Sequence, residues 1–123
     1  YHLFDMYVAY TELLLACFEL ERVLCPHRPP SSTIAINRHA QFSPHRDSGA
    51  GSGQSQSLIV ALGDFTGGEI AVENTAHDIR YKPLEFDGWM ERHWTLPFVG
   101  QRFSLVWFTP LGITEDDLWW WKK

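Results

Sequence analysis

The sequence predicts a mainly β fold, a double-stranded β-helix (jelly roll), with an N-terminal helix packed on the outside. Three observations lead to this prediction. Apolar residues recur at helical spacing over the first two dozen positions. From residue 31 onward, about seven or eight short segments alternate with period two and are separated by turn residues, a pattern typical of a sandwich or barrel. The jelly roll is the simplest of these architectures that also accommodates a leading helix.

The length of the chain indicates one domain. We expect residues 1–123 to form a helix over 3–24, a β core over 31–108 and a C-terminal tail over 109–123. An apolar content of 45% excludes an intrinsically disordered chain and provides enough side chains for a core. Because the sequence starts with Tyr1 rather than Met, we expect an excerpt or a processed chain.

The helix has a clear beginning and end. The apolar stripe runs from Leu3 to Leu24, and Pro26 and the pair Pro29-Pro30 stop it. Its apolar stripe is expected to pack against a sheet rather than to bind a cofactor.

The β region divides into short segments. Ser57–Leu62 is apolar throughout, which predicts a strand buried on both faces. The other expected strands cover residues 33–37, 69–73, 77–81, 84–86, 93–96 and 101–108, with an extended piece over 41–47. The expected turns and loops cover 48–56, 63–68, 74–76, 87–88 and 97–100, and a short helix is expected from Thr114.

The cysteines and the first segment bear on the compartment. Cys17 and Cys25 are eight residues apart in or beside a helix, too far apart to bridge easily, so we expect free thiols in a reducing compartment. The predicted location is therefore intracellular, in the cytoplasm or nucleus. The acidic first segment does not resemble a secretory signal, and no apolar run is long enough for a membrane span.

The most informative motif is His45-Arg46-Asp47. In an extended segment, residues two apart point to the same face, so the imidazole of His45 and the carboxylate of Asp47 aim at a common point. A second histidine would complete the two-His-one-carboxylate set that holds non-haem Fe(II) with open positions. His93, at the start of an expected strand, is the best candidate.

A cation and a hydroxyl follow on the last long strand. Alternation places Arg102, Ser104, Val106 and Phe108 on one face of this strand. A guanidinium facing a barrel interior is costly unless it is paired, and a carboxylate ligand would match its planar fork. The alternative is a structural pair between Arg102 and one of three carboxylates: Asp64, Asp87 or Glu85.

The order of these motifs resembles the Fe(II)/2-oxoglutarate-dependent dioxygenase superfamily. The resemblance rests on His45-x-Asp47, then His93, then Arg102-x-Ser104, and it covers Ile34 to Phe108. The Gly67-Gly68-Glu69-Ile70 step resembles one that precedes a strand in many members. The stretch from Phe86-Asp87-Gly88 to Val106 is more similar to the TET/JBP-like branch, whose members modify nucleic acid.

The resemblance implies a site and a reaction. It implies that His45, Asp47 and His93 ligate Fe(II), and that Arg102, helped by Ser104, binds the distal carboxylate of 2-oxoglutarate. Asn37 could also touch this cosubstrate. The implied reaction consumes O2 and 2-oxoglutarate and hydroxylates a C–H bond, with a modified nucleobase in nucleic acid as one candidate substrate.

Other functions stay open at this point. The net charge of −5 argues against general nucleic-acid affinity and favours a protein or small-molecule hydroxylase, although Arg38, Arg46 and Arg92 could form a local basic rim. A non-catalytic, cupin-like metal- or ligand-binding module is the alternative from another class. The glycine-rich segment over 48–56 lacks the spacing of a nucleotide-binding loop and is interpreted as a lid beside the metal. The oligomeric state is not predicted.

Overall fold

A single helix and nine short strands make up the part of the chain that the computed structural model describes, residues 3–47 and 54–110, with side chains described from Tyr10 onward. In chain order they are α1 (Leu3–Leu24), β1 (Thr33–Arg38), β2 (Ser57–Leu62), β3 (Phe65–Gly67), β4 (Ile70–Val72), β5 (Thr75–His77), β6 (Leu84–Phe86), β7 (His93–Thr95), β8 (Phe98–Gly100) and β9 (Phe103–Phe108).

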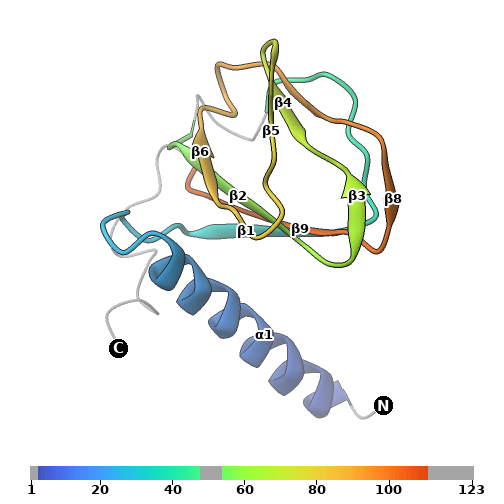
Figure 1. Ribbon diagram of the computed structural model, residues 1–123. Coiled ribbons are helices and arrows are strands. Elements are labelled where there is room, and N and C mark those ends of the chain that lie inside the picture. The colour runs from blue at the N-terminus through green and yellow to red at the C-terminus, as the bar shows by residue number, and fades with distance from the viewer. Residues whose placement is uncertain (1–2, 48–53, 111–123) are drawn as a thin grey trace.

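The strands form three antiparallel sheets. The largest has the order β1-β9-β2-β6, and the smaller ones have the orders β5-β4-β7 and β3-β8. The smaller sheets lie over one face of the largest sheet, and α1 lies on its other side (Figure 1). The prediction of a mainly β fold with a leading helix is therefore confirmed.

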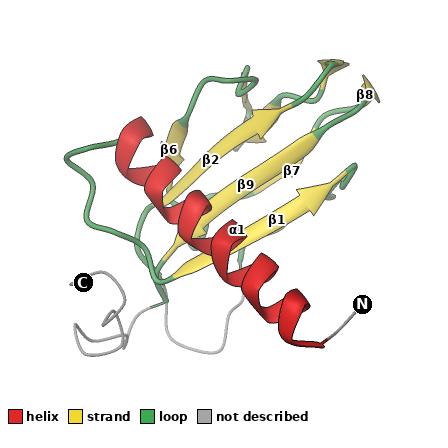
Figure 2. Cartoon of the chain, turned by 90° about the horizontal axis from the view of Figure 1, so that it is seen from below, coloured by secondary structure: helices red, strands yellow, loops and turns green. Residues whose placement is uncertain are grey.

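The helix packs on the face of the large sheet formed by β2, β9 and β1 (Figure 2). Its residues Phe18, Leu20 and Leu24 lie against a buried cluster made by alternate residues of the two central strands: Leu58, Val60, Leu105 and Trp107. The indole Nε1 of Trp107 donates a hydrogen bond of 3.0 Å to the carbonyl oxygen of Cys17. This contact satisfies the polar end of the most deeply buried large side chain and fixes the position of the helix.

The opposite face of β2 supplies a second core. Ile59 and Ala61 pack with Phe86 of the neighbouring strand β6 and with residues of the smaller sheets and the connections: Phe65, Ile70, Val72 and Ile79. Because β2 carries apolar layers on both faces, it is a continuous apolar run, as the sequence predicted. The large sheet is thus the middle layer of the molecule.

A buried ion pair ties the end of the helix to the sheet. Arg28 Nε lies 3.0 Å from Glu21 Oε2, and both side chains are almost fully buried. Ser31 donates to the same carboxylate from its hydroxyl and its backbone N–H. Arg28 also donates to the carbonyl oxygens of Gln56 and Trp107, at 2.6 and 3.3 Å. This network was not predicted, because Arg28 also reaches Gln56 and Trp107, which are 28 and 79 residues away in the sequence.

Several short elements differ from the prediction. The turn was expected over 74–76, but residues 75–77 form a strand paired with β4, and the turn lies at Glu73 and Asn74, with a φ of 52° at Glu73. Residues 65–67 and 98–100 pair with each other as β3 and β8, although both were expected to be loops. The expected extended piece over 41–47 contains a single β-bridge, at His45. Strands of three residues are too short to show periodicity, and β3 and β8 pair with each other across more than thirty residues of sequence.

Other predictions concern the cysteines, a membrane span and the tail. Cys17 and Cys25 are both free thiols, as expected. Across residues 3–47 and 54–110, no helix is both long and apolar enough to cross a membrane. The expected helix from Thr114 and most of the expected lid, residues 48–53, lie outside the described residues.

Removing the buried carboxylate should destabilise the fold. We expect Glu21→Ala to lower the free energy of unfolding by about 3 kcal/mol, since it leaves the buried guanidinium of Arg28 without its main partner. Urea denaturation measures this change. The matched control is Glu19→Ala, which removes an exposed pair with Arg22 and should cost less than about 0.5 kcal/mol. Equal losses in the two variants would contradict the structural role of Glu21.

Candidate metal centre

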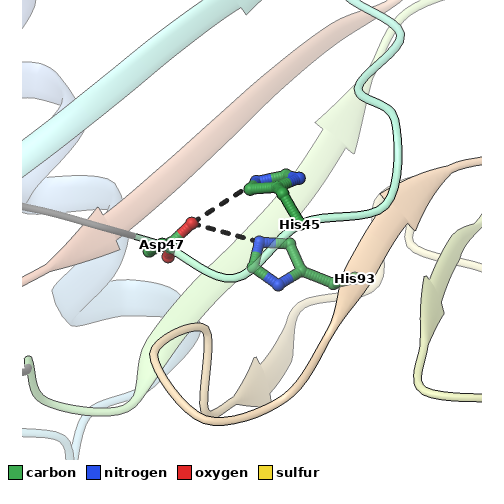
Figure 3. A group of neighbouring side chains, drawn as sticks. All are labelled: His45, Asp47 and His93. Carbon is green, nitrogen blue, oxygen red and sulfur yellow. Dashed lines mark ion pairs between the residues drawn. The ribbon is translucent and has the colours of Figure 1, made fainter.

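Two histidines and one aspartate converge inside the β region. His45, Asp47 and His93 point toward one another (Figure 3), and one ligand atom from each lies within 4.8 Å of the others. Asp47 Oδ1 is 3.4 Å from His45 Nε2 and 3.2 Å from His93 Nε2. The structure therefore brings together the three residues that the sequence analysis selected as metal ligands.

Backbone pairing aligns the two histidines. His45 and His93 face each other in an antiparallel bridge, and each N–H donates to the other's carbonyl oxygen, at 3.1 and 2.9 Å. Residues directly opposite in such a pair project their side chains to the same side. The two imidazole centroids are consequently 4.3 Å apart. The backbone N–H of Asp47 donates to Gly88 O at 2.9 Å, which holds the third ligand beside the pair.

The hydrogen bonds of the imidazoles determine which nitrogen carries the proton. His45 Nδ1 lies 2.7 Å from Ser43 O, and His93 Nδ1 lies 3.0 Å from Glu91 O. A carbonyl oxygen can only accept, so both Nδ1 atoms are donors, and in the neutral rings both Nε2 lone pairs face Asp47. Three electron-rich atoms so close together repel one another unless a cation lies between them. The donor set therefore fits a metal ion.

The ionisation of the group agrees with this geometry. Burial by itself raises the pKa of Asp47, but hydrogen bonds and charge from His93, Gln54 and His45 outweigh burial and hold this pKa below its ordinary value. Burial lowers the pKa of His93, but Asp47 and Glu91 outweigh it and raise this pKa above its ordinary value. In the metal-free protein a proton can bridge the pair, and a bound metal has to displace it.

A cavity of about 470 Å³ opens beside the three ligands. Its walls include the predicted cosubstrate residues Asn37, Arg102 and Ser104. The remaining lining is mostly apolar and aromatic: Ala35, Phe42, Ile59, Ile70, Phe86, Trp94, Val106 and Phe108, with Arg46, Gln54 and Thr95 as further polar members. A largely apolar pocket with a few convergent polar groups is typical of a small-molecule site.

Arg102 is buried in the wall of the cavity, and one of its N–H donors is unsatisfied by the described residues. Its side chain is 2% exposed, and its Nη2 donates to Gly68 O at 2.9 Å. Its Nε has no hydrogen-bond partner among the described residues. Burial lowers the pKa of Arg102, against the smaller opposite effect of Glu69. A buried guanidinium with an unsatisfied N–H is unfavourable by itself, so this wall favours an anionic ligand.

None of the three carboxylates considered as structural partners forms an ion pair with Arg102. Asp64 is 4.0 Å from Arg80, and Glu85 pairs with Arg28 at 3.2 Å. Asp87 accepts hydrogen bonds from two backbone N–H groups in its own turn. Within residues 10–47 and 54–110, no ion pair to Arg102 is formed, so the structural-pair alternative for Arg102 was wrong.

A glycine and two aromatic rings shape the environment of Arg102. Gly68 has a φ of 72°, and a Cβ there would lie 2.7 Å from Arg102 Nε. The guanidinium carbon is 5.6 Å from the ring centroid of Phe65 and 5.4 Å from that of Phe98. The Gly67-Gly68 step is thus needed both for its backbone conformation and for close approach to the arginine.

The other predicted cavity residues lie on neighbouring strands. Asn37 on β1 is directly opposite Ser104 on β9, and its Nδ2 donates to Ser104 Oγ at 3.4 Å. A further histidine of this region, His39, is exposed and bonds to Gln101 Oε1 outside the cavity wall. Gln54 contacts Asp47 and was not predicted, since it belongs to no recognisable motif. Gly88, predicted only as part of a turn, also contacts Asp47.

Comparison with known proteins adds no relative: no family model and no curated protein matches the chain.

Metal binding should depend on the three ligands. At pH 8, where metal competes with fewer protons, a divalent transition metal at one hundred times its dissociation constant should raise the free energy of unfolding by about 2.7 kcal/mol. We expect His45→Ala, Asp47→Ala and His93→Ala each to abolish this stabilisation, measured by thermal unfolding with and without Co(II). His39→Ala is the matched histidine control and should keep it. Retained stoichiometric binding in His93→Ala would exclude this group as the metal centre.

Proposed function

We propose that this protein is an Fe(II)- and 2-oxoglutarate-dependent dioxygenase that hydroxylates a C–H bond. One observation carries the proposal: a buried arginine with an unsatisfied donor lines the same cavity as a His-Asp-His group. Such a cavity suits a ligand that combines a metal-chelating group with a separate carboxylate. 2-Oxoglutarate has both features.

The ligand set favours iron over other metals. Two neutral imidazoles and one carboxylate, with no thiolate, are the donors typical of non-haem Fe(II) sites with open positions. Iron bound there would supply oxygen activation coupled to oxidation of the 2-oxo acid. His45, Asp47 and His93 would hold the metal, and the hydrogen bonds from Nδ1 to Ser43 and Glu91 would keep both rings oriented.

The part of the cavity wall that carries Arg102 would position the cosubstrate. The guanidinium of Arg102 would pair with the distal carboxylate, with Ser104 and Asn37 adding polar contacts. The apolar walls would exclude water, which strengthens the ion pair and protects the reaction from side reactions. The chain's own contribution is to orient one small anion between a metal and a fixed cation.

The fold and the branch of the superfamily are also part of the proposal. We interpret the large sheet facing the smaller sheets as a jelly roll with the site between its layers. The exposed Phe42 and the arginines Arg46 and Arg92 near the cavity would suit a flat base with an anionic backbone, which favours the TET/JBP-like branch. The net charge of −5 favours the alternative, a protein or small-molecule hydroxylase.

An anaerobic titration tests the function. Fe(II) and 2-oxoglutarate are added to the protein, and the weak visible charge-transfer band of a 2-oxo acid chelated to ferrous iron is recorded. The band should form, and it should disappear with release of succinate when O2 is admitted. A folded protein that binds metal but forms no band would favour the cupin-like binding module instead.

The role of Arg102 can be separated from that of the metal. Arg102→Ala should raise the KM for 2-oxoglutarate about 10- to 100-fold, because the proposed charged hydrogen bond to the distal carboxylate is lost, while metal affinity changes little. Arg80→Ala is the matched control, since Arg80 lies outside the cavity wall. An unchanged KM in Arg102→Ala would place the carboxylate site elsewhere.

A further inference from the structure

The two carboxylate oxygens of Asp47 have different surroundings. Oδ1 faces the imidazoles of His45 and His93 at 3.4 and 3.2 Å. Oδ2 points away from them and accepts a hydrogen bond of 2.9 Å from Gln54 Nε2. The proposed metal centre uses Oδ1 and leaves the function of the Oδ2 contact unexplained.

The side-chain amide of Gln54 is itself held in one orientation. A carboxylate can only accept, so the NH₂ group of the amide must face Asp47. The same Nε2 is 2.9 Å from Ser57 Oγ, so its two hydrogens can serve these two acceptors. Ser57 is fully buried and begins β2, the strand in the middle of the molecule. The rigid sheet thus fixes the amide, and the amide fixes Oδ2.

Gly88 closes the remaining space around this oxygen. A Cβ at Gly88 would overlap Asp47 Oδ2 and would lie 3.1 Å from Gln54 Nε2 and 3.2 Å from Ser57 Oγ. The carbonyl oxygen of Gly88 also accepts the backbone N–H of Asp47 at 2.9 Å. Glutamine, serine and glycine therefore form a small polar pocket that the outer oxygen of Asp47 fills. We call it the Oδ2 pocket.

We propose that Gln54 is a positioning residue that keeps Asp47 a monodentate metal ligand. This inference rests on the proposed metal centre. A carboxylate can bind a metal through one or both oxygens, and the second mode uses one more coordination position. With Oδ2 retained in the Oδ2 pocket, only Oδ1 reaches the metal. The coordination position that Oδ2 would otherwise occupy stays open for the ligand whose distal carboxylate Arg102 binds.

A neutral donor suits this role. An arginine or lysine at position 54 would neutralise Asp47 and weaken its attraction for a metal cation. The amide of Gln54 orients the carboxylate and leaves its charge intact. Its hydrogen bond also contributes to the lowered pKa of Asp47, which keeps the ligand ionised.

Co(II) titration of the full chain at pH 8 tests the proposal. Co(II) binds such ligand sets, and its visible absorption depends on coordination number. Gln54→Leu, which keeps the approximate size but removes the donor, should weaken Co(II) binding about 10- to 100-fold. It should also alter the Co(II) spectrum and reduce the spectral change on adding 2-oxoglutarate, because Asp47 then takes the position that this ligand needs.

Two further variants complete the experiment. Gln56→Leu is the matched control, since Gln56 is exposed and lies outside the cavity wall, and its affinity and spectrum should equal those of the parent. Ser57→Ala removes one of the two hydrogen-bond acceptors of the amide. It should weaken Co(II) binding a few-fold and change the Co(II) spectrum in the same direction as Gln54→Leu. If Gln54→Leu does not fold, as judged by circular dichroism, Ser57→Ala decides the question.

The outcomes separate the inference from the proposed function. A folded parent that binds no Co(II) overturns the metal centre and the inference with it. A parent that binds Co(II), with equal affinity and spectrum in Gln54→Leu, overturns the inference alone. Weaker binding with an unchanged spectrum and an unchanged response to 2-oxoglutarate also overturns it, because Gln54 would then support the site without controlling how Asp47 binds.

Discussion

The structure depends on the pairing of β2 with β9 in the middle of the large sheet. These strands share a five-residue antiparallel register, Leu58 opposite Trp107 through Leu62 opposite Phe103. Alternate residues of β9 point to opposite sides, so Leu105 and Trp107 pack under the helix while Ser104 and Val106 line the cavity. One strand therefore builds the core with one face and the candidate site with the other, and a shift by a single residue would exchange the two.

Two buried arginines differ in how completely their guanidinium groups are hydrogen-bonded. Arg28 is surrounded by acceptors, with Glu21, Ser31 and two backbone carbonyl oxygens in contact, and it joins the helix to the sheet. Arg102, which lines the cavity, has one carbonyl partner, and its buried Nε has no hydrogen-bond partner in the part of the chain that the structure describes. The first arrangement is complete without a ligand. The second is not, and this difference is why the charge of Arg102 argues for anion binding and that of Arg28 does not.

Site residues that belong to a short, regular pattern in the sequence could be predicted, and those outside such a pattern could not. His45 and Asp47 could be paired because they are two residues apart, and the face of β9 that carries Arg102 and Ser104 followed from alternation. Gln54 is neither two residues from a predicted metal ligand nor part of an expected alternating strand. It is seven residues from Asp47, across a glycine-rich segment that shows no periodicity, and glutamine is common on surfaces. The short strands β3 and β8 escaped prediction because each is stabilised by a partner more than thirty residues away.

The sequence by itself determined the helix and its end, the doubly buried strand β2, and the residue types available to bind a metal and an anion. These properties are local, since prolines, apolar runs and two-residue spacing act within a few positions. Only the tertiary structure decided that His45 faces His93, that Asp64, Glu85 and Asp87 do not pair with Arg102, and that Oδ2 of Asp47 has a pocket of its own. Each of these results depends on backbone pairing between distant segments, which no short stretch of sequence encodes.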